Sequence, residues 1–489
     1  MNSLQPDAPA KVVDERRAAW VIGVLLFGSL ASALMQSLVI PIQSELPTLL
    51  DTSASNASWV LTATLLGAGV TMPLVGRLAD VYGKKPVLVA SACVLVVGSL
   101  VCALSDVLGL VLVGRVLQGM AMGYIPVAIS MVREVAPPRM VNSATAAVSA
   151  TLGVGGALGL PLAAWIAQGH DWHDLFWVAT ILAVVMVTLT AVFLPNVRDA
   201  HPAKIDYLGA VGLAIGLVGV LVGVSKGNDW GWGEASTIGM IVGGLVVLLL
   251  WGRFELRHSD PLVDLRTMAK RPILLTNIAA MFIGFGMMAQ SIVVPQLLQM
   301  PEVTGYGLGQ SILAAGLWMA PGGLMMLLFA PVSARLLTSY GARITLAIGA
   351  GVLALGYVAA LFLMNAPWQL MIASCISLAG VGVGYAAMPT MILSNVPADE
   401  ASSSVSVNTL MRSIGTTVAG AVMTVVLTSQ TMSLGDVVIP TEGAFRLCFV
   451  IGAAAAAAGA VVVLLVPKAK RPGAQVSAAV EPDELVAAH

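Results

Sequence analysis

The sequence has 489 residues, of which 58% are hydrophobic and only 10% are charged, with a formal net charge of −1. Because soluble domains carry about 25% charged residues, this composition excludes a soluble globular protein and indicates a chain that lies largely within a membrane. The near-neutral charge offers no basic surface for nucleic acid, and the four cysteines fall in or beside apolar stretches, where ordinary packing accounts for them.

Fourteen apolar stretches are long enough to cross a bilayer as helices, since about 20 residues span the hydrocarbon core. The first stretch follows a charged segment without a convincing cleavage site, so we expect it to be retained. The predicted fold class is an all-α polytopic membrane protein. In chain order, the expected transmembrane helices are residues 20–42, 59–76, 86–105, 108–131, 143–167, 174–194, 206–224, 236–254, 273–299, 309–330, 344–364, 367–393, 402–427 and 443–466.

The chain contains an internal repeat. Residues 36–41 read QSLVIP and residues 290–295 read QSIVVP, and PLVGRLADVYGKK at 73–85 has a counterpart, PVSARLLTSYGAR, at 331–343. Further along, a Gly-Tyr pair and a single glycine recur in the same order and at nearly constant spacing. Repeats of this length, built from apolar spans, are typical of transporters whose two membrane-embedded halves enclose a central site. The recurring residues are Gly123-Tyr124 with Gly384-Tyr385, and Gly155 with Gly415.

The repeat matches helices 1–6 to helices 9–14 and leaves helices 7 and 8 without a counterpart. We therefore expect two pseudo-symmetric six-helix bundles and an inserted helix pair. The expected boundaries are 1–19 for a cytoplasmic N-terminal tail, 20–200 for the first bundle, 201–256 for the inserted pair, 257–272 for a cytoplasmic linker, 273–466 for the second bundle and 467–489 for a cytoplasmic C-terminal tail.

Lys and Arg residues gather on one side of the predicted membrane. Most of the 24 fall in loops on the side of the N-terminus or in the two tails, and Lys226 alone falls in an opposite loop. Because cytoplasmic loops carry an excess of Lys and Arg, we expect both termini in the cytoplasm and the protein in the cytoplasmic membrane. The even number of spans also requires the two termini to lie on the same side.

A motif lies in the tight turn between the second and third helices, where residues 76–85 read GRLADVYGKK. Gly76 allows close backbone approach, Gly83 allows a tight turn, and Asp80 can accept hydrogen bonds from a helix N-terminus or pair with an arginine. A nucleotide-binding loop is excluded, because six residues separate the two glycines instead of four and neither Ser nor Thr follows the lysines. An ordinary positively charged loop is the alternative. The expected gating residues are Gly76, Arg77, Asp80, Gly83, Lys84 and Lys85.

This motif resembles the signature loop GxxxDxxGRK of the major facilitator superfamily, with Lys84 in place of Arg. In the fourth helix, Arg115, Gln118 and Gly119 resemble the RxxQG element of the same family. An arginine buried in lipid is costly and usually faces a cavity or a partner. The resemblance implies that Asp80 holds the two halves closed on the cytoplasmic side.

In the fifth helix, Gly155, Gly159 and Pro161 resemble the family's antiporter motif GxxxGP, with one residue inserted before the proline. Its physical content is a face of small residues for tight helix contact, followed by a proline bend. Fourteen spans with an inserted pair resemble the drug:proton antiporter branch of the superfamily. This resemblance implies an exporter of small lipophilic compounds that works by alternating access and is driven by proton entry.

One departure from that branch concerns the proton carrier. The branch usually has an Asp in the first helix where this chain has Met35, and all 25 acidic residues fall in loops, tails or helix ends. Without a buried carboxylate to balance a cation, we expect a preference for neutral or weakly anionic substrates. A cation bound by aromatic and amide contacts is the alternative. The proton-coupling candidates are Arg115, Gln118, Glu45 and Glu134, together with Asp80.

Polar pairs in the first and ninth helices occupy equivalent places in the repeat. Polar side chains in lipid-buried helices favour the protein interior, so we expect Gln36 and Gln290 to face one cavity. Hydrogen bonding between helices, away from any cavity, is the alternative. The residues expected to line the substrate cavity are Gln36, Ser37, Gln290, Ser291, Trp318, Asn408 and Arg412.

We expect no metal, no cofactor and no enzymatic activity. His170 and His173 have a spacing compatible with metal but lack further ligands, and no nucleophile arrangement supports catalysis. The expected partners are a small lipophilic substrate, protons and membrane lipids, and the expected functional unit is a monomer. The alternatives to an exporter are an importer or facilitator of a small metabolite and, in a different class, a non-transporting membrane sensor. The short predicted cytoplasmic loops leave little room for the output domain of such a sensor.

Overall fold

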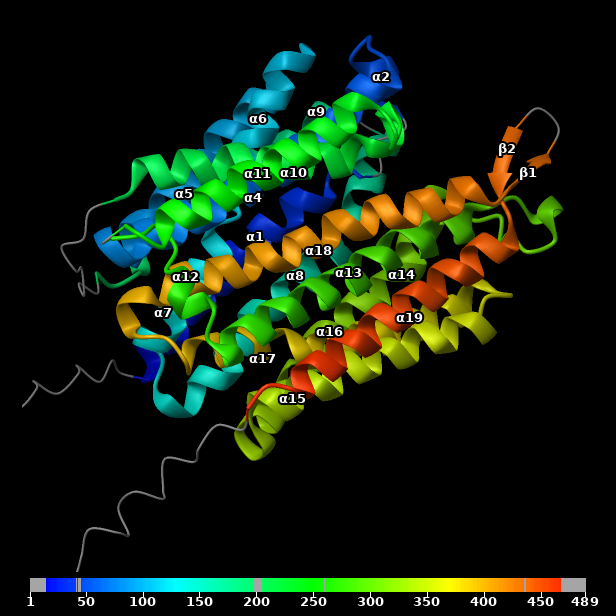
Figure 1. Cartoon of the computed structure of the whole chain (residues 1–489). Coiled ribbons are helices and arrows are strands. Elements are labelled where there is room, and N and C mark those ends of the chain that lie inside the picture. The colour runs from blue at the N-terminus through cyan, green and yellow to red at the C-terminus, as the bar shows by residue number, and fades with distance from the viewer. Residues whose placement is uncertain are drawn as a thin grey trace, which may run out of the picture.

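The structure, a computed structural model, describes residues 15–40, 42, 45–169, 171–196, 205–258, 260–434 and 437–467. Most of these residues form long helices that run side by side (Figure 1). The α-helices are α1 (Glu15–Ser37), α2 (Leu46–Leu49), α3 (Ala54–Ala57), α4 (Trp59–Tyr82), α5 (Lys84–Ala103), α6 (Leu108–Ala121), α7 (Tyr124–Val135), α8 (Pro138–Gly169), α9 (His173–Phe193), α10 (Tyr207–Trp230), α11 (Ala235–Glu255), α12 (Leu265–Met268), α13 (Arg271–Gln299), α14 (Ile312–Leu328), α15 (Ala330–Phe362), α16 (Pro367–Tyr385), α17 (Ala387–Leu393), α18 (Ala401–Ser429) and α19 (Glu442–Leu464). Two short 3-10 helices cover Glu302–Thr304 and Ala398–Glu400, and two strands cover Thr431–Leu434 (β1) and Val437–Pro440 (β2).

Among the described residues, thirteen helical stretches are long and apolar enough to cross a membrane. One of them, Ile312–Phe362, has 51 residues, and a straight helix of that length would measure roughly 75 Å against a hydrocarbon core of about 30 Å. Gly341 interrupts it with non-helical angles, φ 79° and ψ 168°, so this stretch forms two spans. The predicted all-α membrane fold is confirmed, and dividing the long stretch at Gly341 gives the fourteen predicted spans.

The repeat in the sequence has a counterpart in the backbone. Gly83 joins α4 to α5 with φ 92°, and Gly341, at the equivalent place in the second half, has φ 79°. Both angles lie in a region that residues with a Cβ rarely adopt, so glycine is required at both turns. The two Gly-Tyr pairs also mark equivalent helix breaks, since α6 ends just before Tyr124 and α16 ends at Tyr385.

Two features of the fold differ from the sequence-based expectations. The strands β1 and β2 form an antiparallel hairpin that was not predicted. In addition, Lys226 lies within α10 and is 1% exposed, although we expected it in a loop. The helix continues past the predicted end at residue 224, through Gly227, and ends at Gly231, where φ turns to 96°.

The apolar core has two large clusters, one centred on each half of the chain. The first cluster also includes residues of α17 and α18 from the second half, among them Ile392 and Val405. We call the end of the bundle that carries the α4–α5 turn at Gly83 the motif end, and the other, which carries α2 and the β1–β2 hairpin, the opposite end (Figure 1). The core of the first half therefore extends into the second half at the motif end.

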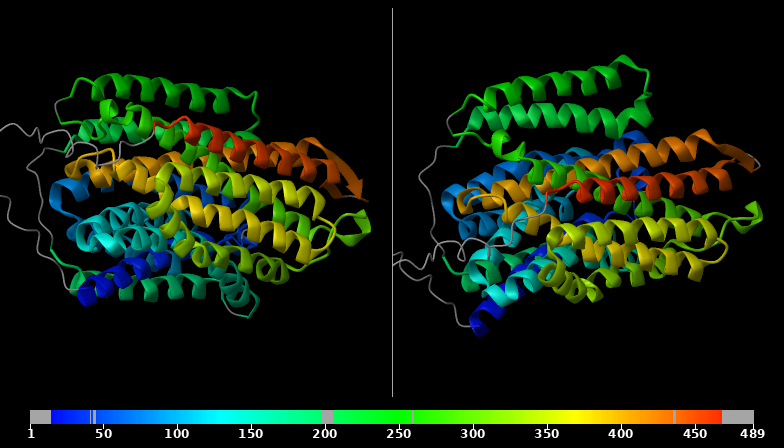
Figure 2. Two further views of the ribbon diagram at one scale, coloured as in Figure 1. Left: turned by 90° about the horizontal axis from the view of Figure 1, so that it is seen from below. Right: turned by 60° about the horizontal axis from the view of Figure 1, so that its bottom comes forward.

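The helices α10 and α11, which we call the inserted pair, lie at the periphery of the bundle (Figure 2). Only α10 packs closely on the rest of the protein, through α4 and α18. In the most apolar window of α11, only 11% of the residues are buried. An apolar helix with so little burial is suited to contact with lipid over most of its surface.

Candidate gating site at the contact between the two halves

The carboxylate of Asp80, near the end of α4, binds the start of α18 in the other half. Its Oδ1 accepts a hydrogen bond from the Ser402 amide at 2.9 Å, and its Oδ2 accepts one from the Ser403 amide at 2.8 Å. The first amides of a helix have no partner within the helix and are usually bound by the side chain of the N-cap residue. The N-cap of α18, Glu400, makes no such bond. Asp80 therefore caps α18 from the opposite half, with its negative charge at the positive end of the helix dipole.

Gly76 lies one turn before Asp80 and allows the two helices to approach closely. An ideal Cβ at this position would lie 2.7 Å from the carbonyl oxygen of Ser402 and would overlap the hydroxyl of Ser406. No side chain larger than hydrogen fits there without moving α18. Gly76 and Asp80 together explain why α4 and α18 touch at the motif end.

Two further hydrogen bonds join α7 to the second half at this end. The hydroxyl oxygens of Ser130 in α7 and Ser402 in α18 lie 2.6 Å apart. Arg133 in α7 donates through Nη1 to the carbonyl oxygen of Leu393, the last residue of α17, at 2.6 Å. The gating contact thus consists of four hydrogen bonds, made by three residues of the first half with α17 and α18.

The other residues of the 76–85 motif surround this contact within the first half. Lys84, which is buried, forms an ion pair with Glu134 in α7. Arg77 and Lys85 are half-buried, and Nε of Arg77 has no hydrogen-bond partner among the described residues. The pair between Lys84 and Glu134 fastens the α4–α5 turn to α7, which carries Ser130 and Arg133.

The glycines of the fifth span pack α8 against α1. An ideal Cβ at Gly155 would lie 2.5 Å from the Cβ of Ala33, and one at Gly159 would overlap the hydroxyl of Ser37. The Ser37 hydroxyl donates to the carbonyl oxygen of Gly155 at 3.1 Å. Pro161 lies inside α8, which also packs along α14 of the second half. Small residues here serve close helix packing, as in other membrane bundles.

Arg115 lies in the core of the first half and is 1% exposed. Its guanidinium donates to the carbonyl oxygens of Val60 at 3.1 Å and Met35 at 3.4 Å, and to Oε1 of Gln118 at 2.6 Å. Gln118 in turn donates to Ser99 at 2.9 Å. These bonds tie together α1, α4, α5 and α6.

The structure does not bring Arg115 together with the acidic candidates for proton coupling. Glu134 pairs with Lys84 at the motif end, and Glu45 is exposed beside α2 at the opposite end. The physical reason is that carbonyl oxygens and an amide satisfy Arg115 locally, so that no carboxylate is needed beside it. The expected route from Arg115 to acids at the helix ends therefore has no continuous contact in this conformation.

Gln36 and Gln290, predicted to face one cavity, lie in different surroundings in this conformation. Gln290 is buried and lines a narrow pocket whose other residues all belong to the second half, including Tyr357, Ser374 and Phe449. Gln36 is half-buried in α1, and Ser291 is exposed. The side of α13 that carries Gln290 faces α15, α16 and α19, so the equivalent positions in the two halves face different surroundings.

The remaining cavity candidates lie at separate places in the second half. Trp318 donates its indole N–H to Gln310 at 3.1 Å, near the start of α14. Asn408 in α18 is buried and donates to Asn277 in α13 at 2.9 Å. Arg412, one turn further along α18, has its guanidinium 4.6 Å from the centre of the Tyr385 ring, a cation–π distance. Asn408 and Arg412 are thus neighbours within the second half.

The sequence model of the Major Facilitator Superfamily matches residues 25–420 of the chain. The chain belongs to this superfamily. Members of this superfamily are multi-pass membrane transporters of the secondary type rather than enzymes. The fold of this chain agrees with that of the human organic anion transporter MFSD10, whose crystal structure superimposes with a TM-score of 0.64 at 15% identity, covering 94% of this chain and 100% of that one.

Relatives within the superfamily are distant. The uncharacterized MFS-type transporter Rv1877 of Mycobacterium tuberculosis is 30% identical over 305 residues, which make up 62% of this chain and 43% of Rv1877. The lincomycin resistance protein LmrB of Listeria monocytogenes is 26% identical over 303 residues, which make up 61% of this chain and 63% of LmrB. The chain thus matches less than two thirds of the length of either relative.

Several residues of this contact between the halves were not singled out from the sequence. Ser402 and Ser403 follow Asp399 and Glu400, and such a run of Asp, Glu and Ser is typical of a helix start. The start of α18 is therefore predictable from the sequence. Its contact with Asp80 is not, because nothing local in the sequence relates this helix start to Asp80. The bond between Arg133 and Leu393 was equally hidden, since a backbone acceptor leaves no sequence signal.

Proposed function

We propose that this protein exports small lipophilic compounds from the cytoplasm in exchange for protons, by alternating access between its two halves. The observation that carries the proposal is the capping of α18 by Asp80, a contact that holds the halves together at one end of the bundle. The small residues and proline of α8 support export, and so does the similarity to LmrB, a lincomycin resistance protein. We further propose that the motif end, with both termini, faces the cytoplasm.

In this proposal the structure represents the state closed toward the cytoplasm. Opening would break the two hydrogen bonds to the Asp80 carboxylate, each worth about 1.5–3 kcal/mol because the acceptor is charged. Energies of this size are comparable to the differential binding energy of a substrate or proton, so ligand binding can shift the equilibrium between the two states. The gating contact would then be strong enough to stabilise the closed state and weak enough for ligand binding to break it.

The function can be tested in proteoliposomes with two dyes of similar shape, one neutral and lipophilic and one a quaternary ammonium. We expect the neutral dye to accumulate in the lumen only when the lumen is acidic, and to do so faster than the cationic dye. The physical reason is that Arg115 and Arg412 are buried cations within their helices, while the buried carboxyl groups among the described residues, Asp80, Asp206 and Glu255, lie at helix ends.

The outcomes separate the alternatives. Equilibration that ignores the pH gradient would indicate a facilitator, and no movement of any dye would favour a sensor. A clear preference for the quaternary ammonium dye would contradict the proposed substrate charge. Arg115→Ala is the matching variant for coupling, because full dependence on the pH gradient in that variant would exclude Arg115 from proton transfer.

The variant Asp80→Asn tests the gating contact directly. Asparagine offers one acceptor oxygen and one NH₂ group, so one α18 amide keeps its partner while the other faces a donor. With one charged hydrogen bond lost, at about 1.5–3 kcal/mol, we expect turnover to fall roughly tenfold or more while membrane insertion remains normal. The control is Asp399→Asn, which removes an exposed carboxylate from the same end of the bundle. If Asp80→Asn transports at the wild-type rate in proteoliposomes, the motif serves only to set the membrane topology of the chain.

A further inference from the structure

Two buried carboxyl groups meet where the inserted pair joins the rest of the chain at the motif end. Asp206 is the N-cap of α10 and is 6% exposed, and Glu255 is the last residue of α11 and is 2% exposed. The two helices are antiparallel neighbours (Figure 2), which brings the start of one beside the end of the other. Neither residue belongs to the gating contact.

One oxygen of each carboxyl group is bound by a backbone amide. Oδ1 of Asp206 accepts from the Gly209 amide at 2.7 Å, and Oε1 of Glu255 accepts from the Val263 amide at 2.8 Å. The second bond joins α11 to the segment that leads through α12 into the second half. These two bonds fix the orientation of both carboxyl groups.

The other two oxygens face each other across Gly209. Both Oδ2 of Asp206 and Oε2 of Glu255 are buried and lack a hydrogen-bond partner among the described residues. Each would lie less than 3.0 Å from an ideal Cβ on Gly209, so both point into the same small space. A buried oxygen without a donor is costly, and two facing carboxylate oxygens also repel each other.

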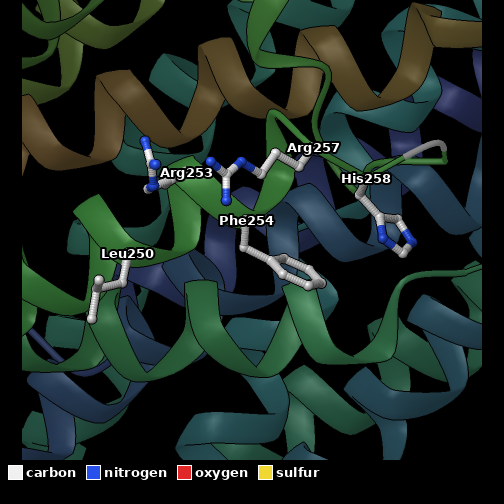
Figure 3. Close-up of a pocket in the computed structure, with 5 residues that line it drawn as sticks. All are labelled: Leu250, Arg253, Phe254, Arg257 and His258. Atoms are coloured by element: carbon white, nitrogen blue, oxygen red, sulfur yellow. The ribbon is translucent and has the colours of Figure 1, made fainter.

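The charged groups on the neighbouring segments are engaged elsewhere. Arg253 lies two residues before Glu255, about 200° around the helix, and Arg257 lies in the turn that follows α11. Both line a separate open pocket of about 320 Å³ with Leu250, Phe254 and His258 (Figure 3). Arg266 donates to the carbonyl oxygen of Leu256 at 2.9 Å, and Asp264 accepts from the Arg266 amide and the Thr267 hydroxyl. Within the described residues, no Lys or Arg forms an ion pair with Asp206 or Glu255.

We propose that Asp206 and Glu255 bind one proton between them, and that this shared proton fastens the start of α10 to the end of α11, while the other carboxyl oxygen of Glu255 holds the Val263 amide. A single proton turns one of the facing oxygens into a donor and leaves the other as its acceptor, so both gain a partner at once. A divalent metal fits less well, because Ca²⁺ or Mg²⁺ requires six or more oxygen ligands and this site offers two free ones. The site goes beyond the proposed transport function and does not depend on it.

The proposal predicts a pH dependence with a definite sign. At low pH the shared proton is bound and links Asp206 to Glu255. As the pH rises and this proton is lost, two negative charges are left facing each other, so the folded state loses stability. Glu255→Gln supplies a permanent N–H donor to Asp206, so we expect this part of the pH dependence to disappear from the thermal unfolding midpoint of the purified protein in detergent. Asp206→Asn should act in the same way. Glu234→Gln is the matched control, because Glu234 is an exposed acid at the other end of the inserted pair.

Infrared spectroscopy gives a readout that stability alone cannot mimic. We expect the wild-type protein near neutral pH to show the C=O stretch of a protonated carboxylic acid, and either variant of the pair to lose the equivalent of one such group per chain, while Glu234→Gln loses none. Unchanged acid bands in both pair variants would overturn the proposal. A rise in the thermal unfolding midpoint on addition of Mg²⁺ or Ca²⁺ at constant pH would also overturn the proposal, since that result would assign the site to a metal ion.

Discussion

Linking Ser130 and Ser402 through a disulfide is expected to stop transport almost completely. Their hydroxyl oxygens lie 2.6 Å apart across the two halves, so the Ser130→Cys/Ser402→Cys variant places two thiols in contact when the motif end is closed. Oxidation would then hold this end shut and prevent the alternation that transport requires. A reductant should restore turnover, because the bond rather than the substitutions causes the block. The measurement is dye accumulation in proteoliposomes before oxidation, after oxidation and after reduction.

The controls for this experiment come from the chain itself. Each single cysteine variant, oxidised in the same way, should retain transport. The native Cys93 and Cys375, which are not fully buried, are best replaced by serine in every variant. Undiminished transport by a fully oxidised double variant would mean that the halves do not separate at this contact, and the proposed gate would then be wrong.

Gly76→Ala is expected to hold the motif end open. The added methyl group would overlap the Ser406 hydroxyl and lie 2.7 Å from the Ser402 carbonyl oxygen, which forces α4 and α18 apart. Overpacking of this kind costs about 1–3 kcal/mol, a factor of roughly 5–150 in the ratio of closed to open states. We therefore expect a loss of transport comparable to that of the disulfide, but with the opposite conformation trapped.

The two states can be distinguished by labelling a cysteine at position 402. Ser402 is fully buried when the gate is closed, so Ser402→Cys should react slowly with an impermeant thiol reagent and faster once Gly76→Ala is added. Gly109→Ala is the control, because an ideal Cβ there meets no atom within 4 Å. Equal labelling rates in the presence and absence of Gly76→Ala would show that close packing at Gly76 does not govern closure.

The fold was predictable because its determinants are local. Apolar stretches of membrane length identify the spans, and glycines such as Gly83 and Gly341 identify turns that need a positive φ. The candidate site was predictable only in part. Asp80 was singled out as a residue able to cap a helix, but the sequence did not say which helix, since the partners lie more than 300 residues away and their pairing depends on how the two halves pack.

The surroundings of Gln290 were not predictable for a different reason. The ninth span is apolar around most of its circumference, so periodicity does not show which side faces the interior between the halves. A polar residue in such a helix indicates burial, and Gln290 is indeed buried, but burial against neighbours within the same half satisfies that rule equally well. Asp206 and Glu255 were overlooked because each alone is an ordinary acid at a helix end.

The way α10 is attached has a consequence for any rocking motion of the halves. Its contacts with the first half include Lys226 over the Trp59 ring at 4.7 Å and a hydrogen bond between Thr62 and Ser225 at 3.2 Å. Among the described residues, its polar contact with the second half is one long bond of 3.4 Å, from Asn228 to the carbonyl oxygen of Ala421. If the two halves tilt apart at the opposite end, as the proposed alternating access requires, we expect this bond to break before the contacts with the first half. The inserted pair would then move with the first half, and α18 would slide past α10.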